Sequence, residues 1–303
     1  VIIGVSFLVF FIMDLAPGDA VDILAPEGAT AEDLEAIRHD LGLDQPVIVR
    51  YVKYMGGMLH GDMGVSYVSK TDVFDTYMEK LPATIKLSFA SILVSILLSV
   101  PLGIYSATRQ GTVQDNISMI VAMIGLSMPN FWLGLLLIIV FSLNLGWFPS
   151  GGDQTLSSIV LPAITIGTGL MATLTRTTRS SMLDVLKQEY LRTARAKGIP
   201  EKIVITSHAL RNALIPIITI IGTQLAGVLG GSVLTETVFA WPGVGRLIVD
   251  SLNMRDTPLV TGSIIMTTIL LSIILLLVDL LYAVVDPRIK AQYVAKRGKK
   301  KHG

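Results

Sequence analysis

The chain has 303 residues, of which 51% are hydrophobic and only 16% are charged, and its mean hydropathy is +0.65. An average soluble domain carries about 25% charged residues, so this composition excludes a disordered protein, a coiled coil and an ordinary cytosolic enzyme. The chain has no cysteine, which excludes disulfides, thiolate metal sites and cysteine nucleophiles. The four histidines share no ligand spacing, so we expect no metal centre. The composition indicates an all-α polytopic membrane protein.

Five charge-free runs are long enough to cross a bilayer as helices. A crossing takes about 20 apolar residues, because the hydrocarbon offers the backbone no water to bind. The runs are 87–108, 116–152, 154–175, 212–235 and 257–278. They predict membrane helices at about 83–108, 116–145, 157–176, 212–235 and 258–285, with residues 145–152 forming a turn out of the membrane.

The first thirteen residues are apolar but too few to span a bilayer. We interpret 1–13 as a first transmembrane helix that is cut at its cytoplasmic end, which brings the expected number of spans to six. The alternative is the hydrophobic part of a cleaved signal peptide, although no basic region precedes it. Four prolines within the spans are expected to kink helices inside a bundle. They are Pro101, Pro129, Pro162 and Pro216.

Basic residues in the loops predict the orientation. Residues 176–211 carry eight Lys and Arg against three acids, and 285–303 carry seven against one, so both segments are expected in the cytoplasm. The loop 236–256 holds two basic and three acidic residues and is expected outside. Residues 14–81 hold five basic residues and thirteen acids, and alternation places this segment outside as well. Both chain termini are then cytoplasmic.

The extracytoplasmic segment 14–81 is long enough to fold on the membrane surface. Thr30 and Asp33 resemble an N-cap pair that starts a helix at 31–40, which Gly42 ends. Pro46 is expected to open a second helix, and Thr71 to cap the helix that leads to the second span. A short strand-like run lies between these two helices. One face of the second helix is expected to carry Ile48, Tyr51, Val52, Met55 and Leu59.

A short amphipathic helix is predicted inside the cytoplasmic loop 177–211. Residues 189–197 are good helix formers, Gly198 suits the position after a helix, and Pro200 can start the next one. Its apolar side carries Tyr190, Leu191 and Ala194. Two interpretations remain open at this point. The segment either docks on a partner as a discrete helix, or it is a basic loop that sets topology or lies on anionic lipid.

The chain lacks the sequence features of an energy source. No G-x-x-x-x-G-K-[ST] run is present, so it has no Walker-type phosphate loop. Apart from Arg176 at the end of the third expected span, only Lys86 and Asp279 carry charge inside the five expected spans, and both lie near helix ends. A secondary transporter coupled to protons or sodium usually needs such groups near the midplane. A secondary transporter or channel, and a membrane-anchored scaffold, are kept as alternatives from other classes.

Several stretches resemble one family. Glu189-Tyr-Leu-Arg-Thr-Ala-Arg-Ala-Lys-Gly198, followed by His208-Ala-Leu-Arg-Asn-Ala-Leu-Ile-Pro216, is similar to the EAA-type loop of ABC importer permeases, and most similar to the B-type permease of the dipeptide, oligopeptide and nickel group. The general motif has Glu-Ala-Ala where this chain has Arg192-Thr-Ala194, which is typical of the peptide-type variant. Further matching stretches are Leu15-Ala-Pro-Gly-Asp19, Leu41-Gly-Leu-Asp-Gln-Pro46, Gly61-Asp-Met-Gly64, Phe239-Ala-Trp-Pro-Gly243, Arg255-Asp256, Asp279-Leu-Leu-Tyr282 and Asp286-Pro-Arg288.

The resemblance implies a type I ABC importer permease fold, with an ABC transmembrane type-1 domain at 82–286 and a basic cytoplasmic tail at 287–303. It implies a non-catalytic permease subunit that forms half of a peptide pathway in a bacterial or archaeal cytoplasmic membrane; nickel or glutathione is the alternative substrate. The implied partners are a paralogous C-type permease, two cytoplasmic ATPases that bind ATP and Mg, and an external binding protein, with no nucleic acid. This chain itself would bind no cofactor, and its pathway residues are not identified.

The same resemblance implies that the helix at 189–198 couples the permease to an ATPase. Tyr190, Leu191 and Ala194 would pack in a groove on the ATPase, and Arg192 and Arg195 would meet acidic groups at its rim. ATP-driven closure would then switch the cavity from outward- to inward-facing. The complete set of implied coupling residues is Glu189, Tyr190, Leu191, Arg192, Thr193, Ala194, Arg195, Lys197 and Gly198.

Overall fold

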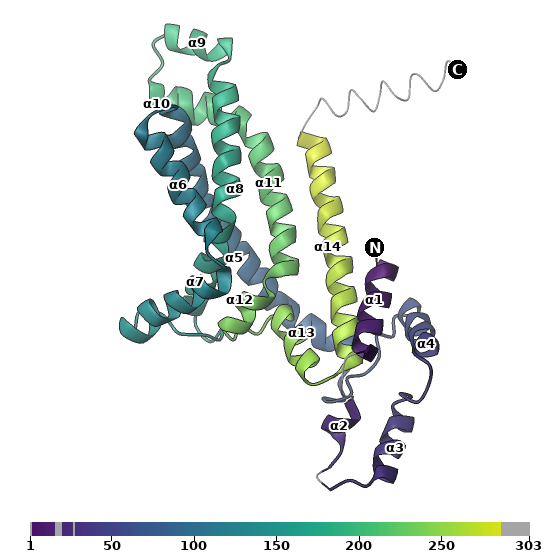
Figure 1. Ribbon diagram of the computed structural model, residues 1–303. Coiled ribbons are helices and arrows are strands. Elements are labelled where there is room, and N and C mark those ends of the chain that lie inside the picture. The colour runs from purple at the N-terminus through teal and green to yellow at the C-terminus, as the bar shows by residue number, and fades with distance from the viewer. Residues whose placement is uncertain (1, 16–19, 27, 286–303) are drawn as a thin grey trace, which may run out of the picture. The chain divides into compact units, whose positions relative to one another are not determined.

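The computed structural model describes residues 2–15, 20–26 and 28–285, and this part of the chain is almost entirely helical (Figure 1). The α-helices are α1 Ile2–Leu15, α2 Ala20–Leu24, α3 Ala31–Asp40, α4 Val47–Leu59, α5 Val73–Thr108, α6 Val113–Ser127, α7 Asn130–Leu137, α8 Val160–Leu186, α9 Glu189–Ala196, α10 Glu201–Ile203, α11 Leu210–Gly231, α12 Val233–Val238, α13 Val244–Asn253 and α14 Thr257–Val285. Three further turns are the π-helical η1 Ile138–Asn144 and η3 Val204–Ala209, and the 3₁₀ turn η2 Leu156–Ile159. The all-α fold class is confirmed. The expected tail, 287–303, lies outside the described residues.

The described part of the chain packs as two compact units. Unit 1 comprises the described residues within 1–86, Gly151–Asp153 and Leu229–Leu271, and unit 2 comprises Leu87–Ser150, Gln154–Val228 and the described residues from Ser272 onward. Helices α5, α11 and α14 contribute residues to both units. This is a division by packing, and the domain boundary expected at residue 82 stays a prediction.

Four helical stretches of the described chain are long and apolar enough to cross a membrane. They are Val73–Thr108, Leu156–Leu186, Glu201–Gly231 and Thr257–Leu280. A fifth span results if α6 and the stretch Asn130–Asn144 are counted together, although they are bent by 96°. Helix α1 is apolar but has only 14 residues, about 21 Å of helix at 1.5 Å per residue, which is less than the hydrocarbon thickness.

The helices differ from the expected ranges mainly at their ends. The helix expected at 83–108 already begins at Val73, and its cap is Asp72, whose Oδ1 accepts a bond of 3.0 Å from the Asp75 N–H, so the assignment of Thr71 as the cap is wrong. The helix expected at 157–176 continues to Leu186. The helix expected at 212–235 ends at Gly231 and is preceded without a break by η3 and α10. Helical structure therefore occupies most of the expected loop 177–211, in which only short connections flank α9.

The single helix expected at 116–145 is wrong, because the chain breaks at Pro129. Met128 adopts an extended conformation with φ −95° and ψ 128°, which is the region that a residue before proline prefers. Pro129 then precedes the first turn of α7, where its missing N–H costs nothing. By contrast, Pro216 lies inside α11, which remains continuous. In these two places, a proline that precedes a new first turn accompanies a break, and a proline inside a helix leaves the helix continuous.

In unit 2, α5 and α8 approach closely along small residues. Four serines of α5 are fully buried, namely Ser88, Ser91, Ser95 and Ser99. A Cβ placed on Gly103 of α5 would lie 2.6 Å from the Thr178 Cβ, and one on Gly167 of α8 would lie 2.9 Å from the Ser91 carbonyl oxygen. Close approach through small side chains is how membrane helices gain van der Waals contact without a hydrophobic driving force.

In unit 1, a buried carboxylate caps α13. Glu236 is fully buried, and its Oε2 accepts a bond of 3.1 Å from the backbone N–H of Arg246 in the first turn of α13. Its Oε1 accepts bonds from the hydroxyls of Ser232 at 2.8 Å and Thr84 at 2.9 Å. A Cβ on Gly243, the N-cap residue, would lie 2.4 Å from Oε2. Glu236 therefore takes the place of an N-cap side chain, and its carboxyl oxygen lies at the positive end of the helix dipole.

The segment between α1 and α5 is held to α14 by a second buried carboxylate. Asp256 is 1% exposed and accepts bonds from the Tyr67 N–H at 3.2 Å, the Val68 N–H at 3.3 Å and the Ser66 hydroxyl. Val65 and Asp72 form an isolated antiparallel β-bridge, and Tyr67 and Val68 lie in the turn between them. The strand-like run expected here is thus a single bridge whose turn is bonded to the residue before α14.

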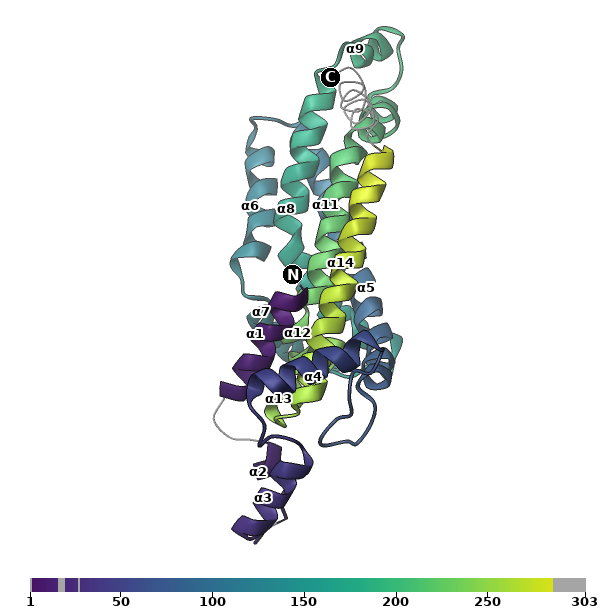
Figure 2. The same cartoon turned by 90° about the vertical axis from the view of Figure 1, so that its right-hand side faces the viewer.

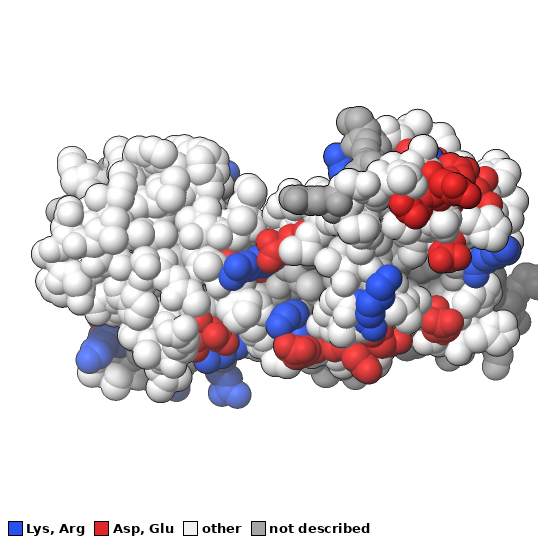
Figure 3. Space-filling model, turned by 90° about the horizontal axis from the view of Figure 1, so that it is seen from below, with Lys and Arg blue, Asp and Glu red and all other residues white. Residues whose placement is uncertain are grey.

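The local expectations for the acidic segment are confirmed at α3. Thr30 and Asp33 form a reciprocal capping box, and Gly42 after the helix has φ +67°. Figure 3 shows Asp and Glu side chains gathered on the face of unit 1 that carries this helix. The acids on and next to α3 are Glu32, Asp33, Glu35, Asp40 and Asp44.

Candidate functional site

The predicted helix at residues 189–198 is present as α9, Glu189–Ala196. Glu189 lies in its first turn and Arg195 in its last, so both charges complement the helix dipole. The helix stops in a Schellman motif, in which the Gly198 N–H bonds the Arg195 carbonyl at 2.9 Å and the Ile199 N–H bonds the Ala194 carbonyl at 3.4 Å. Gly198 has φ +76°, the left-handed conformation that this motif requires.

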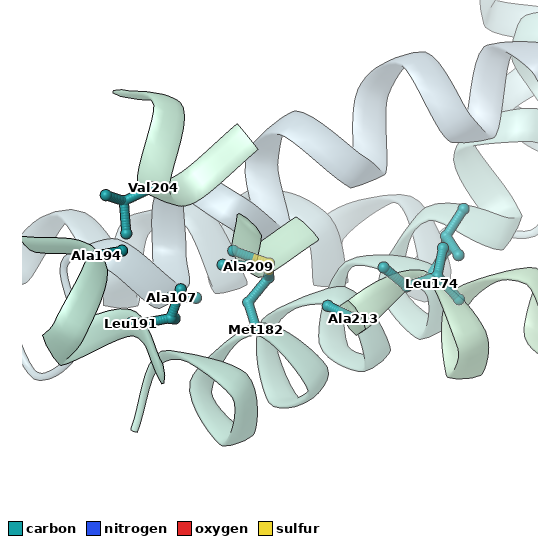
Figure 4. Close-up of a cluster of buried hydrophobic side chains, with 9 residues drawn as sticks. Ala107, Leu174, Met182, Leu191, Ala194, Val204, Ala209 and Ala213 are labelled. Atoms are coloured by element: carbon teal, nitrogen blue, oxygen red, sulfur yellow. The ribbon is translucent and has the colours of Figure 1, made fainter. Parts of the chain in front are cut away.

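One side of α9 is buried against the chain itself. Leu191 is 0% and Ala194 8% exposed, and both belong to a hydrophobic cluster with Met182 of α8 and Val204 of η3. Figure 4 shows these side chains pointing toward one another, with Ala107 of α5 beside Leu191. The remaining buried members are Leu174, Ala209, Ala213 and Ile217. The expectation that Leu191 and Ala194 pack in a partner's groove is therefore wrong.

Polar contacts also tie α9 to the start of the next long helix. The guanidinium of Arg195 donates two bonds to the carboxylate of Glu201, from Nε at 3.0 Å and from Nη2 at 2.9 Å, and this pairing raises the pKa of Arg195. The Asn212 amide donates to the Tyr190 hydroxyl at 2.6 Å. Since Glu201 begins α10 and Asn212 lies in α11, α9 is fastened to both.

The outer side of α9 is polar and available. Glu189, Arg192, Thr193 and Lys197 are exposed, and Tyr190 is 42% exposed. Within this side Arg192 pairs with Glu189 at 2.8 Å, a contact between two exposed side chains. Such a pair contributes little to stability, so a competing partner can replace it at small cost. The side that can meet another protein is the charged one.

The structure also shows two buried ionic or acidic positions that were not singled out from the sequence. They are Glu236, described above, and the pair of Asp115 with Arg179 that joins α6 to α8. Glu236 could have been noticed in the sequence, because it is an acid just before the stretch Phe239–Gly243 in an otherwise apolar region. In the described residues no group of three or more His, Asp or Glu could hold a metal ion.

Comparison with protein-family models gives two matches that together cover almost the whole chain. Residues 1–88 match the N-terminal part of binding-protein-dependent transport system membrane components, and residues 99–291 match the binding-protein-dependent transport system inner membrane component. The chain belongs to this family. It is therefore a membrane-spanning permease of the ABC importer type, which decides against a secondary transporter, a channel or a scaffold.

Named relatives agree with the family. The permease is 43% identical over 301 residues to the oligopeptide transport system permease protein AppB of Bacillus subtilis, covering 96% of this chain and 95% of that one. It is 41% identical over 286 residues to the glutathione transport system permease protein GsiC of Escherichia coli K12, covering 94% of each. ABC importer permeases work with ATPases and binding proteins, and membership places this permease in the inner membrane.

Two solved structures share the fold. A chain of the inward-facing MetNI methionine ABC transporter matches with a TM-score of 0.59 at 19% identity, covering 70% of this chain and 97% of that chain. A chain of an amino acid ABC transporter with histidines matches with a TM-score of 0.52 at 13% identity, covering 71% and 94%. At these identities the likeness concerns the fold, and it confirms the expected type I importer permease architecture.

Proposed function

We propose that this permease imports di- or oligopeptides and that α9 is its coupling helix toward a cytoplasmic ATPase. The 43% identity to an oligopeptide permease along 96% of the chain supports the substrate class. The 41% identity to a glutathione permease supports a second candidate, glutathione, which is itself a small peptide-like molecule. Transport of labelled dipeptide, oligopeptide and glutathione by the reconstituted importer distinguishes these substrates.

The observation that carries the coupling role is the way α9 is fastened. Its inner side shares one hydrophobic cluster with α8 and η3, and its ends bond to α10 and α11. A force applied to the outer side therefore reaches two long helices through packed contacts rather than through a flexible loop. A helix that only set topology would need its basic residues, but it would not need this packing and these hydrogen bonds to neighbouring helices.

The rest of the assembly follows from the same proposal. The second half of the pathway is a paralogous C-type permease, both chain termini and α9 are cytoplasmic, and segment 14–81 faces the binding protein. ATP and Mg are bound by the ATPases, and this chain is a non-catalytic subunit without a cofactor. The absence of a phosphate-binding loop supports that last point. The purified permease alone should show no ATPase activity and no stoichiometric nucleotide binding.

The experiment for the coupling role reverses charge on the outer side of α9. Arg192→Glu and Lys197→Glu should lower copurification of the ATPase or the transport-coupled ATP hydrolysis, while the permease stays folded because both side chains are exposed. The matched control is Arg109→Glu, the same change at an exposed arginine just after α5 and outside both α9 and segment 14–81. Full coupling in both α9 variants would overturn the assignment.

A further inference from the structure

Helix α4 carries an apolar stripe that the rest of the described chain leaves uncovered. The stripe consists of Ile48, Val52 and Leu59, which are 65%, 63% and 80% exposed. Tyr51, expected on the same face, instead turns toward α1, where its ring lies 5.3 Å from that of Phe7. The structure therefore divides one apolar surface into a packed side and an open side.

The open side of α4 occupies one arc of the helix, and its basic residues lie outside that arc. At about 100° per residue, Ile48, Val52 and Leu59 fall within about 40° of one another around the helix. On the same wheel Lys53 and Arg50 lie roughly 140° and 200° from Ile48. Lys53 is exposed, whereas Arg50 is bound to Asp14 at the end of α1. An apolar stripe on one side and basic residues on the other is the pattern of a helix that lies in a membrane interface.

The direction of α4 fits this position. Within unit 1, α4 runs across the direction of the first part of α14 in Figure 2, and Figure 1 shows it nearly end-on beside α1. Since α14 is a membrane span, a helix that crosses its direction lies along the plane of the membrane. A helix of 13 residues in this orientation places its whole stripe at a single depth.

Helix α1, which packs against α4, also carries exposed apolar side chains. Phe7 and Phe11 of α1 are 46% and 40% exposed, and α1 is fixed against α4 by the Phe7–Tyr51 ring contact and by a bond of 2.9 Å between the Ser6 and Tyr51 hydroxyls. Further exposed apolar residues of α1 are Ile3, Leu8, Ile12 and Leu15. One occupant that covers both helices must itself be apolar and extended.

We propose that α4 is an interfacial helix whose stripe is bound by phospholipid. The three stripe side chains sit at the boundary of headgroups and acyl chains, and Lys53 faces water on the opposite side. The leaflet is the outer one if segment 14–81 is extracytoplasmic as proposed above. The helix then fixes the depth of the soluble segment that follows α1, because moving the stripe into water would expose its apolar area.

The test uses single cysteines in the otherwise cysteine-free chain. Val52→Cys and Leu59→Cys on the stripe, and Lys53→Cys as the matched control, are labelled with an environment-sensitive fluorophore. The complete importer is reconstituted in phosphatidylcholine vesicles with brominated lipid in both leaflets, so that the result does not depend on topology. We expect the stripe labels to show blue-shifted emission and loss of intensity with brominated lipid. The label at position 53 should be quenched by aqueous iodide.

Three results would overturn the proposal. Stripe labels quenched by iodide and not by lipid would show that the stripe is in water. Stripe labels protected from both quenchers in the assembled importer would show that a protein subunit covers it. Equal lipid quenching at positions 52 and 53 would show that α4 does not lie with one side in the interface.

Discussion

The guanidinium of Arg179 donates two parallel hydrogen bonds to the carboxylate of Asp115, from Nε at 2.8 Å and from Nη2 at 2.6 Å. The Asp115 side chain is only 3% exposed and also accepts a bond of 3.0 Å from the Gly111 N–H and one from the Ser106 hydroxyl. One carboxylate therefore joins α8, the end of α5 and the connection to α6. This fork geometry is specific to arginine.

Removing the cation should destabilise unit 2. Arg179→Ala leaves a buried carboxylate without its charge partner, and we expect a loss of about 3 kcal/mol in the free energy of unfolding. Adding Asp115→Asn should recover part of that loss, because the remaining side chain is neutral. Thermal unfolding of the purified permease measures both, with Arg192→Ala, which breaks an exposed pair, as a control expected to cost about 0.5 kcal/mol or less.

Leu191→Ala should weaken the packing of α9 against α8 and η3. The side chain is fully buried in the cluster of Figure 4, and truncating a buried leucine costs about 2–5 kcal/mol. We expect faster limited proteolysis after Lys197 in this variant. The Ala196→Ser variant, changed on the exposed side of the same helix, should be cleaved at the same rate as the unchanged permease. Equal rates in both variants would contradict the burial of Leu191.

Substitutions of Gly198 should rank by their tolerance of positive φ. A Cβ there would meet no atom within 4 Å, so only the backbone at φ +76° is strained. We expect Gly198→Val to cost more than Gly198→Ala, each by about 1 kcal/mol or more, and Gly198→Asn to cost less. Coupled ATP hydrolysis by the reconstituted importer should fall in the same order. A loss that followed side-chain volume instead would point to a steric contact with a partner.

Gly243→Ala should disrupt the cap of α13. The added Cβ would overlap Oε2 of Glu236, at 2.4 Å, and the Thr84 hydroxyl oxygen, at 2.5 Å. Overpacking at a buried site costs about 1–3 kcal/mol. Glu236→Gln keeps the volume, but its amide N–H₂ would face the Arg246 N–H or the two hydroxyl donors, at a cost of about 1–3 kcal/mol. Lower thermal stability of both variants is the expected result.

The proposed topology is open to labelling from outside the cell. Ser69 and Ser207 are both exposed, so single cysteines there can react with a maleimide. An impermeant maleimide applied to intact cells should modify position 69 and leave 207 unmodified until the cells are opened. The reverse pattern would invert the orientation of the whole chain.

The sequence by itself determined the elements whose cause is local. Charge-free runs became helices because a backbone in hydrocarbon must satisfy its own hydrogen bonds. Thr30 with Asp33 formed the capping box, and Gly198 ended α9, because caps depend on a few neighbouring residues. The motifs also resemble one family closely enough to predict an ABC importer permease without the fold.

Only the tertiary structure decided which surfaces are covered. Periodicity placed Leu191 and Ala194 on one side of α9. The sequence pattern did not show that this side is covered by Met182 of α8 and Val204 of η3. Likewise Tyr51 and Val52 are neighbours in sequence, yet one packs on α1 and the other is open. An apolar pattern predicts that a helix face will be buried, because burying apolar surface is favourable but not directional. Which residues bury that face is decided by the packing of the whole chain.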